Sequence, residues 1–370
     1  VSPVAGFDPD AALDTIDRLQ KLGPQVLIEN DAGLYAFSAD DEYRKAGVTP
    51  VPREEIFAKS DLILSVNSLP DDDLKYCRKG QVLCSVVNVA ENSEWLEKAR
   101  TAGLTVLALD IIPRTTRAQA MDILSSMATV SGYKAVLDAA SLLPRFFPMF
   151  MSAAGTIKPS RVLILGAGVA GLQAVAIARK LGAVVEVFDV RTAVKDEVKS
   201  LGGKFIEVEG SREDTTAGGY AVEQTEEYKR KQQELIQNRA VAADVIIATA
   251  QIPGKKAPLL IHAETVRSMK PGSVIIDLAA SSGGNCELTE NNKTITVNGV
   301  KVVGKSDFPS ELPSDGSKMF GSNVINLFKI MVSGEGKFDL NFKDEIILKT
   351  CAVHNREYVS PVLRQILNIK

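Results

Sequence analysis

The stretch from Arg161 to Arg191 constrains the fold of this chain more than any other part of the sequence. An apolar run leads into the glycine-rich turn Gly166-x-Gly168-x-x-Gly171. A helical pattern follows, and a second apolar run ends at the acid Asp189. This order of strand, turn, helix, strand and acid predicts a βαβ unit that binds a dinucleotide.

Each glycine of the turn has a mechanical reason. Gly166 lets the chain turn tightly off a strand, Gly168 lets backbone approach a pyrophosphate without a Cβ in the way, and Gly171 lets the helix pack close to the sheet. The helix that starts at Val169 and Ala170 presents free N–H groups and the positive end of its dipole to the phosphates.

The acid at the end of the second apolar run predicts which cofactor is bound. Asp189 can accept hydrogen bonds from the adenosine ribose hydroxyls, which favours NAD(H) over NADP(H). We expect its neighbours Val190 and Arg191 to line the same site. Thr249 and Ala250, which follow a later apolar run, are expected there as well.

Composition excludes several classes of function. The chain has 370 residues, 45% hydrophobic and 24% charged, which is typical of a soluble globular protein with room for two domains. The net charge is −3 and no basic block occurs, so nucleic acid is not an expected partner. Four cysteines without CxxC spacing and only two histidines predict no metal site.

Apolar runs alternate with helical patterns on both sides of the glycine turn. Expected strands are 25–29, 62–66, 82–87, 105–109, 204–208, 245–249 and 274–278, and expected helices are 40–46, 93–102, 193–201, 226–239 and 263–269. A long helical segment, 117–142, lies between the two groups, and a loop at 308–316 precedes a helix at 322–331. Alternation of this kind predicts parallel sheets covered by helices.

The expected fold is therefore α/β, with two Rossmann-like doubly wound parallel-sheet domains joined by the long helix and a cleft between them. We expect residues 1–128 plus 313–370 to form a first, discontinuous domain and residues 135–312 to form the NAD(H)-binding domain. One polar interval beside the latter, 209–222, is either a surface excursion or a lid over the cofactor. The aromatic Tyr220 after Gly219 favours the lid.

Two further motifs carry a resemblance to a known family. They are PRTTRAQAMDILSSMATVSGYKAV at 113–136, and IPGKKAPLLI at 252–261 followed by MKPGSVIIDLAASSGGNC at 269–286. With the glycine turn they resemble the NAD(H)-binding component, called domain I or the alpha subunit, of proton-translocating nicotinamide nucleotide transhydrogenase. The resemblance runs from about Phe7 almost to the C-terminus. Alanine dehydrogenases share the fold and the glycine turn.

The resemblance implies roles for individual residues. Arg114, Gln119, Asp122 and Ser125 would line the nicotinamide end of the site, with Gln119 directed toward NADP(H) on a partner domain. Tyr220 matches the tyrosine of a mobile loop. Gln232 and Gln251 fall at positions that approach the nucleotide, although the family usually has leucine at the second. Without the resemblance, the favoured interpretation is that Arg114 and Asp122 form a structural ion pair and that Ser125 and Ser126 are small packing residues.

Two positions separate the possible reactions. A dehydrogenase that oxidises an amine needs a general acid/base, which alanine dehydrogenases supply as a lysine and a histidine. This chain has Ser65 and Asn88 there. Hydride transfer between two nicotinamides needs no such group; it needs two rings held at about 3–3.5 Å with water excluded. Many transhydrogenases also carry the lysine, so Ser65 departs from both groups.

The expected function is thus direct hydride transfer between NADH and NADP⁺ on a partner domain, coupled to proton translocation. By resemblance, the partners are an NADP(H)-binding domain and a membrane-spanning proton-channel domain, and this chain forms a homodimer. It would be the soluble part of a membrane-bound enzyme, facing the cytoplasm or the mitochondrial matrix. A free-standing amino-acid dehydrogenase and a non-catalytic NAD sensor are the alternatives.

Overall fold

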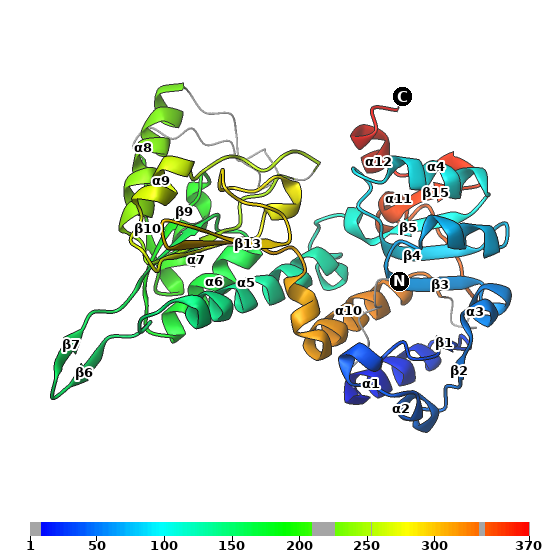
Figure 1. Ribbon diagram of the computed structural model, residues 1–370. Coiled ribbons are helices and arrows are strands. Elements are labelled where there is room, and N and C mark those ends of the chain that lie inside the picture. Colours follow the sequence, from blue (N-terminus) through cyan, green and yellow to red (C-terminus); the bar gives the residue numbers. More distant parts are fainter. Residues whose placement is uncertain (1–8, 209–225, 253, 333–336, 370) are drawn as a thin grey trace. The chain divides into compact units, whose positions relative to one another are not determined.

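The computed structural model describes residues 9–208, 226–252, 254–332 and 337–369 (Figure 1). The chain divides into two compact units, residues 1–127 with 312–370 as unit 1 and residues 128–311 as unit 2. The interval predicted to be a lid, with Gly219 and Tyr220, lies outside the described residues. The predicted cleft between the two units remains a prediction.

Unit 2 is a doubly wound sheet. Its described residues form seven strands in the order β10-β9-β8-β11-β12-β14-β13, all parallel to their neighbours except β13, which is antiparallel to β14. The strands are β8 (Arg161–Leu165), β9 (Val184–Phe188), β10 (Lys204–Phe205), β11 (Val245–Ala248), β12 (Val274–Asp277), β13 (Lys293–Val297) and β14 (Val300–Gly304). The chain runs outward from β8 in one direction and then from β11 in the other. The carboxyl ends of these two strands form the switch point at which such sheets bind ligands.

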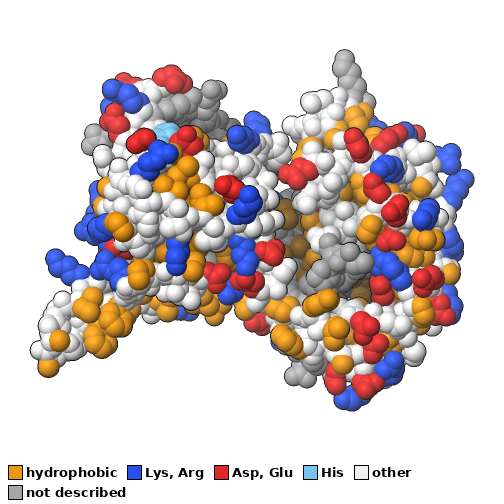
Figure 2. Space-filling model, in the orientation of Figure 1, with side chains coloured by type: hydrophobic (Ala, Val, Ile, Leu, Met, Phe, Trp, Pro, Cys, Tyr) orange, Lys and Arg blue, Asp and Glu red, His pale blue; other side chains and the backbone are white. Residues whose placement is uncertain are grey.

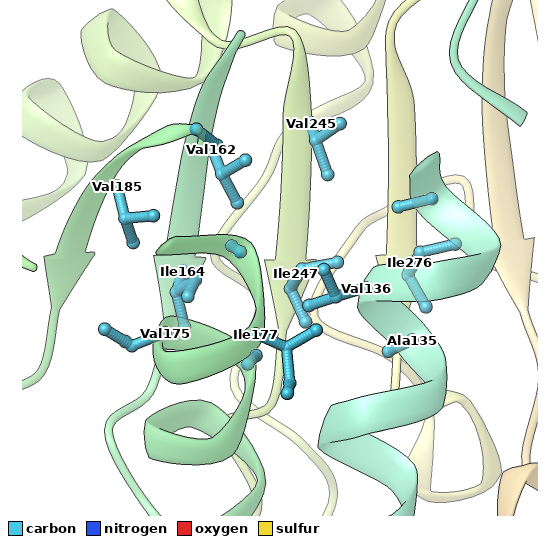
Figure 3. Packing of buried hydrophobic residues seen from close by; sticks show 14 of the residues in the cluster. Ala135, Val136, Val162, Ile164, Val175, Ile177, Val185, Val245, Ile247 and Ile276 are labelled. Carbon is cyan, nitrogen blue, oxygen red and sulfur yellow. The ribbon is translucent and has the colours of Figure 1, made fainter. Parts of the chain in front are cut away.

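Helices cover both faces of this sheet (Figure 1). They are α5 (Ile123–Leu142), α6 (Val169–Lys180), α7 (Lys195–Ser200), α8 (Glu226–Ala242) and α9 (Ala263–Ser268). In β8, Val162 and Ile164 face the cluster that contains α5 and α6, as Figure 3 shows, whereas Leu163 and Leu165 face the cluster that contains α8. A strand buried on both faces needs an unbroken apolar run, which is why the sequence shows one there.

Unit 1 is built on a smaller, mixed sheet. Its described residues give the order β16-β15-β5-β4-β3, in which β3 (Leu62–Asn67), β4 (Val82–Val86) and β5 (Thr105–Ala108) are parallel. The strands β15 (Cys351–His354) and β16 (Glu357–Tyr358) are antiparallel and come from the C-terminal region of the chain. A separate parallel pair consists of β1 (Ile28–Glu29) and β2 (Pro50–Val51).

The helices of unit 1 surround these strands. They are α1 (Pro9–Gln20), α2 (Asp40–Lys45), α3 (Arg53–Lys59), α4 (Ser93–Thr101), α10 (Pro313–Phe328), α11 (Glu345–Thr350) and α12 (Pro361–Ile366). α4 and α12 contribute to one cluster against the sheet, whereas α10 and α11 contribute to another. The α/β fold class and the parallel strands predicted from the sequence are confirmed in both units.

Among the differences between the structure and the sequence-based expectation, three concern the joints between elements. The loop expected through Gly316 is helical, because α10 begins at Pro313, and proline is favoured in the first turn of a helix, where its missing N–H has no partner to lose. The long helix begins at Ile123, with a 3-10 turn, η4 (Gln119–Met121), before it. The hairpin of β6 (Phe150–Ser152) and β7 (Gly155–Ile157) is not predicted by the sequence pattern.

Candidate nucleotide-binding site

The turn after β8 adopts the geometry that its glycines predict. Gly166 has a φ of +103°, and its N–H donates to the carbonyl of Phe188 at 2.8 Å. A Cβ on Gly166 would lie 2.6 Å from Oγ1 of Thr249, and a Cβ on Gly171 would lie 1.9 Å from the carbonyl oxygen of Gly166. Both glycines are therefore required by the protein's own packing.

The middle glycine differs from the other two. Gly168 is the N-cap of α6 and has a φ of −77°, which other residues also adopt. Apart from the adjacent residues and the backbone of its own helix, no described atom lies within 4 Å of the place that a Cβ on Gly168 would occupy. Packing of the described residues thus does not require a glycine here, although glycine is a better N-cap than alanine. The open space lies at a helix N-terminus, where backbone N–H groups favour an anion.

Asp189 follows β9 and is buried, with 8% of its surface exposed. Its Oδ2 accepts a hydrogen bond from the N–H of Ala167 at 2.7 Å, which ties the acid to the glycine turn. Its Oδ1 accepts from the N–H of Arg191 at 2.8 Å. The Arg191 guanidinium donates to both oxygens, from Nε at 2.9 Å and from Nη2 at 2.8 Å.

The residues after β11 complete this group. Thr249 donates from its N–H to Leu165 and from Oγ1 to Gly166, at 2.8 and 3.0 Å, so it lies directly beneath the glycine turn. Ala250 follows it. The parallel strands β8, β9 and β11 therefore bring Gly166, Asp189 and Thr249 to one edge of the sheet.

The two glutamines predicted to approach the nucleotide have different environments. Gln251 is exposed, and its Nε2 donates to the carbonyl of Leu278, after β12, at 2.9 Å. Gln232 is half-buried on α8. Val190, the residue after Asp189, is partly buried against the hydrophobic cluster that contains α8.

Sequence reasoning missed two buried polar residues that hold this edge together. Asn285 accepts from the Ala250 N–H at 3.0 Å, donates to the Ala250 carbonyl at 2.9 Å, and also donates to the carbonyl of Pro258 at 2.8 Å. Asp277, at the end of β12, accepts from the N–H of Asn285 at 2.7 Å and from Oγ1 of Thr289 at 2.6 Å. Both side chains lie in the motif 269–286, and their burial, which would have shown their role, is not visible in the sequence.

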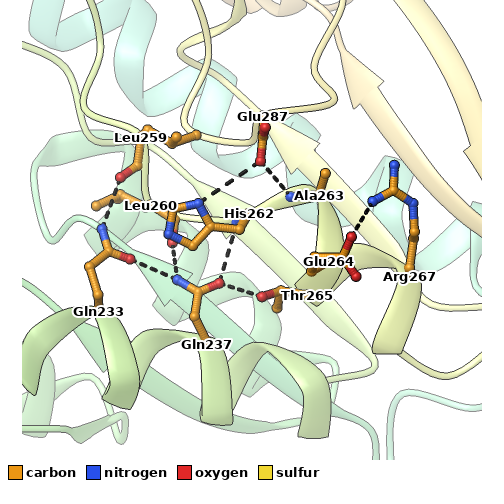
Figure 4. Close-up of polar contacts among 10 residues, drawn as sticks. All are labelled: Gln233, Gln237, Leu259, Leu260, His262, Ala263, Glu264, Thr265, Arg267 and Glu287. Carbon is orange, nitrogen blue, oxygen red and sulfur yellow. Dashed lines mark hydrogen bonds and ion pairs between the residues drawn. The ribbon is translucent and has the colours of Figure 1, made fainter. Parts of the chain in front are cut away.

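A glutamine of α8 holds the chain farther along the same segment (Figure 4). Gln237 donates from Nε2 to the carbonyl of Leu260 at 2.8 Å, and its Oε1 accepts from Oγ1 of Thr265 at 2.5 Å and from the N–H of His262 at 3.3 Å. Gln233 donates to the carbonyl of Leu259 at 3.1 Å. The segment after β11 is thus anchored to α8 as well as to Asn285.

The residues predicted to line the nicotinamide end all lie in unit 1. They belong to residues 113–125, which we call the RAQ loop. Arg114 and Gln119 are exposed. The loop backbone is held by α10, because Asn323 and Asn326 both donate to the carbonyl of Ala120, at 2.9 and 3.2 Å. The Arg117 guanidinium also donates to both carboxylate oxygens of Asp344, the N-cap of α11.

Asp122 has a clear structural task at the end of the RAQ loop. It immediately precedes α5, and its Oδ1 accepts from the N–H of Ser125 at 2.9 Å, as an N-cap side chain does. Oγ of Ser125 donates to Oδ2 of Asp122 at 2.6 Å. The pair satisfies the first turn of α5 and sets the direction of both side chains.

The two positions at which alanine dehydrogenases carry acid/base groups have local structural uses here. The Ser65 hydroxyl donates to the carbonyl of Asn67 at 2.6 Å. Asn88 has a φ of +55°, a conformation that asparagine tolerates well, in a turn whose flanking N–H groups of Val87 and Val89 donate to Asp110. Neither serine nor asparagine exchanges a proton at neutral pH.

Unit 1 contains a cavity of about 1710 Å³ beside β1 and β3, and none of the residues predicted to bind nucleotide lines it. Among the described residues, no group of histidine, cysteine and acidic side chains could hold a metal ion. None of the helices in the described ranges is both long and apolar enough to span a bilayer.

The glycine turn, the helix after it and the acid at the switch point define an α/β protein of the Rossmann type. More particularly, the chain belongs to the alanine dehydrogenase/PNT family, whose N-terminal domain model matches residues 11–131 and whose C-terminal domain model matches residues 135–361.

Within this family, the chain is similar to individual transhydrogenase proteins. The chain is 42% identical over 354 residues to the NAD(P) transhydrogenase subunit alpha of Haemophilus influenzae, covering 95% of this chain and 69% of that protein. It is 39% identical over 358 residues to the NAD(P) transhydrogenase subunit alpha of Cereibacter sphaeroides, covering 95% and 68%. A solved transhydrogenase structure from Sinorhizobium meliloti superposes with a TM-score of 0.82 at 36% identity, covering 97% and 95% of the two chains.

Proposed function

We propose that this chain is the NAD(H)-binding component of a proton-translocating transhydrogenase. In this role it holds NADH while hydride passes directly to NADP⁺ on a partner domain. The observation that carries the proposal is a glycine turn and acid built for a dinucleotide in a chain that has Ser65 and Asn88 where a substrate dehydrogenase needs a lysine and a histidine. The transhydrogenase names of the similar proteins support it.

The described residues fit an adenine dinucleotide. We assign the pyrophosphate to the open space at Gly168, where the N-terminus of α6 would supply N–H donors to it. Asp189 stands at the end of the neighbouring strand, where the adenosine ribose lies in this fold. Thr249 and Ala250 close the edge of the site, and Gln232, Gln251 and Tyr220 are assigned to it by resemblance.

By resemblance, we assign the nicotinamide end of the cofactor to the residues of the RAQ loop. Bound dihydronicotinamide supplies the hydride, and the chain's own residues need only orient the ring and exclude water. Arg114, Gln119, Asp122 and Ser125 offer hydrogen-bonding groups for that purpose. Contacts with Asn323 and Asp344 anchor the loop, which lowers the entropy cost of ordering it on binding.

The chain requires partners for turnover. We assign NADP(H) to a partner domain and proton translocation to a membrane-spanning domain of the same enzyme, with this chain facing the cytoplasm or the mitochondrial matrix. We also propose a homodimer. The β6–β7 hairpin supports it, because apolar side chains gather on this projecting arm (Figure 2), and Phe150, Met151 and Ile157 are 46%, 70% and 41% exposed.

Mixing experiments test this function directly. The full chain is combined with an NADP(H)-binding transhydrogenase domain, NADH and thio-NADP⁺, and reduction of the analogue is followed by absorbance. We expect reduction that requires both proteins and no amino acid. Reduction of NAD⁺ by the chain alone with L-alanine would establish an amino-acid dehydrogenase instead, and NADH binding without either activity would establish a sensor.

A further inference from the structure

The carboxylate of Asp189 is saturated with hydrogen bonds from the described residues. It accepts from two backbone N–H groups, those of Ala167 and Arg191, and from Nε and Nη2 of the Arg191 side chain, all at 2.7–2.9 Å. A carboxylate offers about four lone-pair positions. A ribose diol that is to donate to Asp189 must therefore displace donors that are already there.

The side chain of Arg191 is the group that can leave. The N–H of Ala167 belongs to the glycine turn and the N–H of Arg191 to the turn after β9, so neither can move without rebuilding the site. The Arg191 side chain is 30% exposed and has several rotatable bonds, whereas the Asp189 side chain is only 6% exposed. Ribose binding thus exchanges two guanidinium hydrogen bonds for two hydroxyl hydrogen bonds at the same carboxylate.

We propose that Arg191 is a second determinant of cofactor choice: a latent 2′-phosphate-binding residue that Asp189 neutralises. The inference rests on the proposed NAD(H) site. A guanidinium is matched in shape and charge to a phosphate, and Arg191 stands at the carboxylate that faces the ribose 2′ position. The Asp189 carboxylate both repels a 2′-phosphate and holds the cation that could bind one. The choice of NAD(H) thus depends on Asp189 neutralising Arg191 as well as on the contacts of Asp189 with the ribose.

A neighbouring cation provides a matched control. Lys195, the first residue of α7, follows Arg191 closely in the chain but pairs with its own acid, Glu207. Removal of the Asp189 charge leaves that pair intact. The proposal therefore predicts an effect at Arg191 that has no counterpart at Lys195.

The test is a double-mutant cycle on the full chain with adenosine 2′,5′-bisphosphate, NADPH and NADH as probes. Asp189→Asn is expected to weaken NADH binding and to strengthen bisphosphate and NADPH binding by about tenfold or more, a gain that unfolding could not produce. Adding Arg191→Gln should abolish the gain, whereas adding Lys195→Gln should preserve it. A gain that survives Arg191→Gln, or no gain in a folded Asp189→Asn variant that still binds NADH, overturns the assignment.

A second measurement applies if Asp189→Asn does not fold. Arg191→Gln keeps both backbone contacts of Asp189, and it should raise the ratio of the NADPH dissociation constant to that of NADH. An unchanged ratio would count against the role of Arg191. If the unmodified chain binds no NADH, the proposed function itself fails; if it binds NADH and the ratio stays unchanged, only the Arg191 assignment fails.

Discussion

Gly171 and Gly166 are in backbone contact: a Cβ on Gly171 would lie 1.9 Å from the carbonyl oxygen of Gly166 and 2.9 Å from its carbonyl carbon. This contact sets how closely α6 approaches the end of β8. It also separates the glycines of the turn into two that the fold requires and one, Gly168, that faces open space.

The three glycines are expected to respond differently to alanine. Gly171→Ala and Gly166→Ala should each destabilise the chain by about 1–3 kcal/mol, the first through overpacking and the second also through its positive φ. Gly168→Ala should cost less, about 0.5 kcal/mol, because alanine is a poorer N-cap than glycine. Its NADH affinity should nevertheless fall, because the new Cβ occupies the space assigned to the pyrophosphate.

Thermal unfolding and NADH titration of the three variants check this prediction. Gly168→Ala is the informative variant, since its two readouts should separate. A Gly168→Ala protein as unstable as Gly171→Ala, or one with unchanged NADH affinity, would show that the open space has another use.

Asn285 should be the most sensitive polar side chain of the site. Its replacement by alanine leaves the N–H and carbonyl of Ala250 and the carbonyl of Pro258 without their partner, which costs at least about 2 kcal/mol in a buried setting. NADH affinity should fall as well, because the loop after β11 loses its support. Gln251→Leu, which restores the residue usual in the family at an exposed position, is the control and should leave stability nearly unchanged.

Chemical denaturation with an NADH titration measures both effects for each variant. A stable Asn285→Ala protein with normal NADH affinity would mean that the contacts of Gln237 with Leu260 and Thr265 suffice to hold the segment.

The contrast between Asn285 and the glycine turn shows what a single sequence can predict. The turn can be predicted because its strand, glycines, helix and Asp189 are contiguous in the sequence. Because β8 is buried on both faces, its residues form an unbroken apolar run that can be recognised. Asn285 acts across 35 residues on Ala250, and no local pattern encodes that contact. The start of α10 escapes prediction because Pro313 and Gly316 resemble a loop, although proline is well placed in a first turn.

The ion pair between Arg117 and Asp344 should make the anchoring of the RAQ loop depend on pH. The hydrogen bond from Arg117 lowers the pKa of Asp344 below its ordinary value. A carboxyl group whose pKa is depressed on folding contributes stability above the unfolded-state pKa and loses it as pH falls through the folded value. Arg117→Gln should therefore lower the melting temperature at neutral pH, and the difference from the unmodified chain should shrink below pH about 4.

Melting temperatures over a pH series test this dependence. Lys349→Gln is the control, because Lys349 pairs with Glu345 within α11, whereas Arg117 joins that helix to the RAQ loop. Only Arg117→Gln is expected to slow hydride transfer to NADP⁺ on the partner domain. Equal slowing by both variants would indicate that α11 as a whole, rather than its link to the loop, matters.

The β6–β7 hairpin should hold the proposed homodimer together. Phe146 and Phe150 stack with their ring centroids 4.9 Å apart, which gives the arm a preformed apolar surface, and Met151 is 70% exposed. Large apolar side chains at the centre of an interface contribute about 1–2 kcal/mol or more each when truncated. Phe150→Ser combined with Met151→Ser should thus convert a dimer to a monomer in sedimentation velocity at micromolar concentration.

A matched surface substitution separates loss of the interface from general loss of exposed apolar area. Tyr35, in unit 1, is as exposed as Met151 at 70%, so Tyr35→Ser removes a comparable side chain away from the hairpin and should leave the dimer intact. The hairpin variant should keep its melting temperature at low protein concentration, because the strand residues of the arm are all exposed. A monomeric unmodified chain would refute the homodimer. A hairpin variant that remains dimeric would place the dimer interface on another surface.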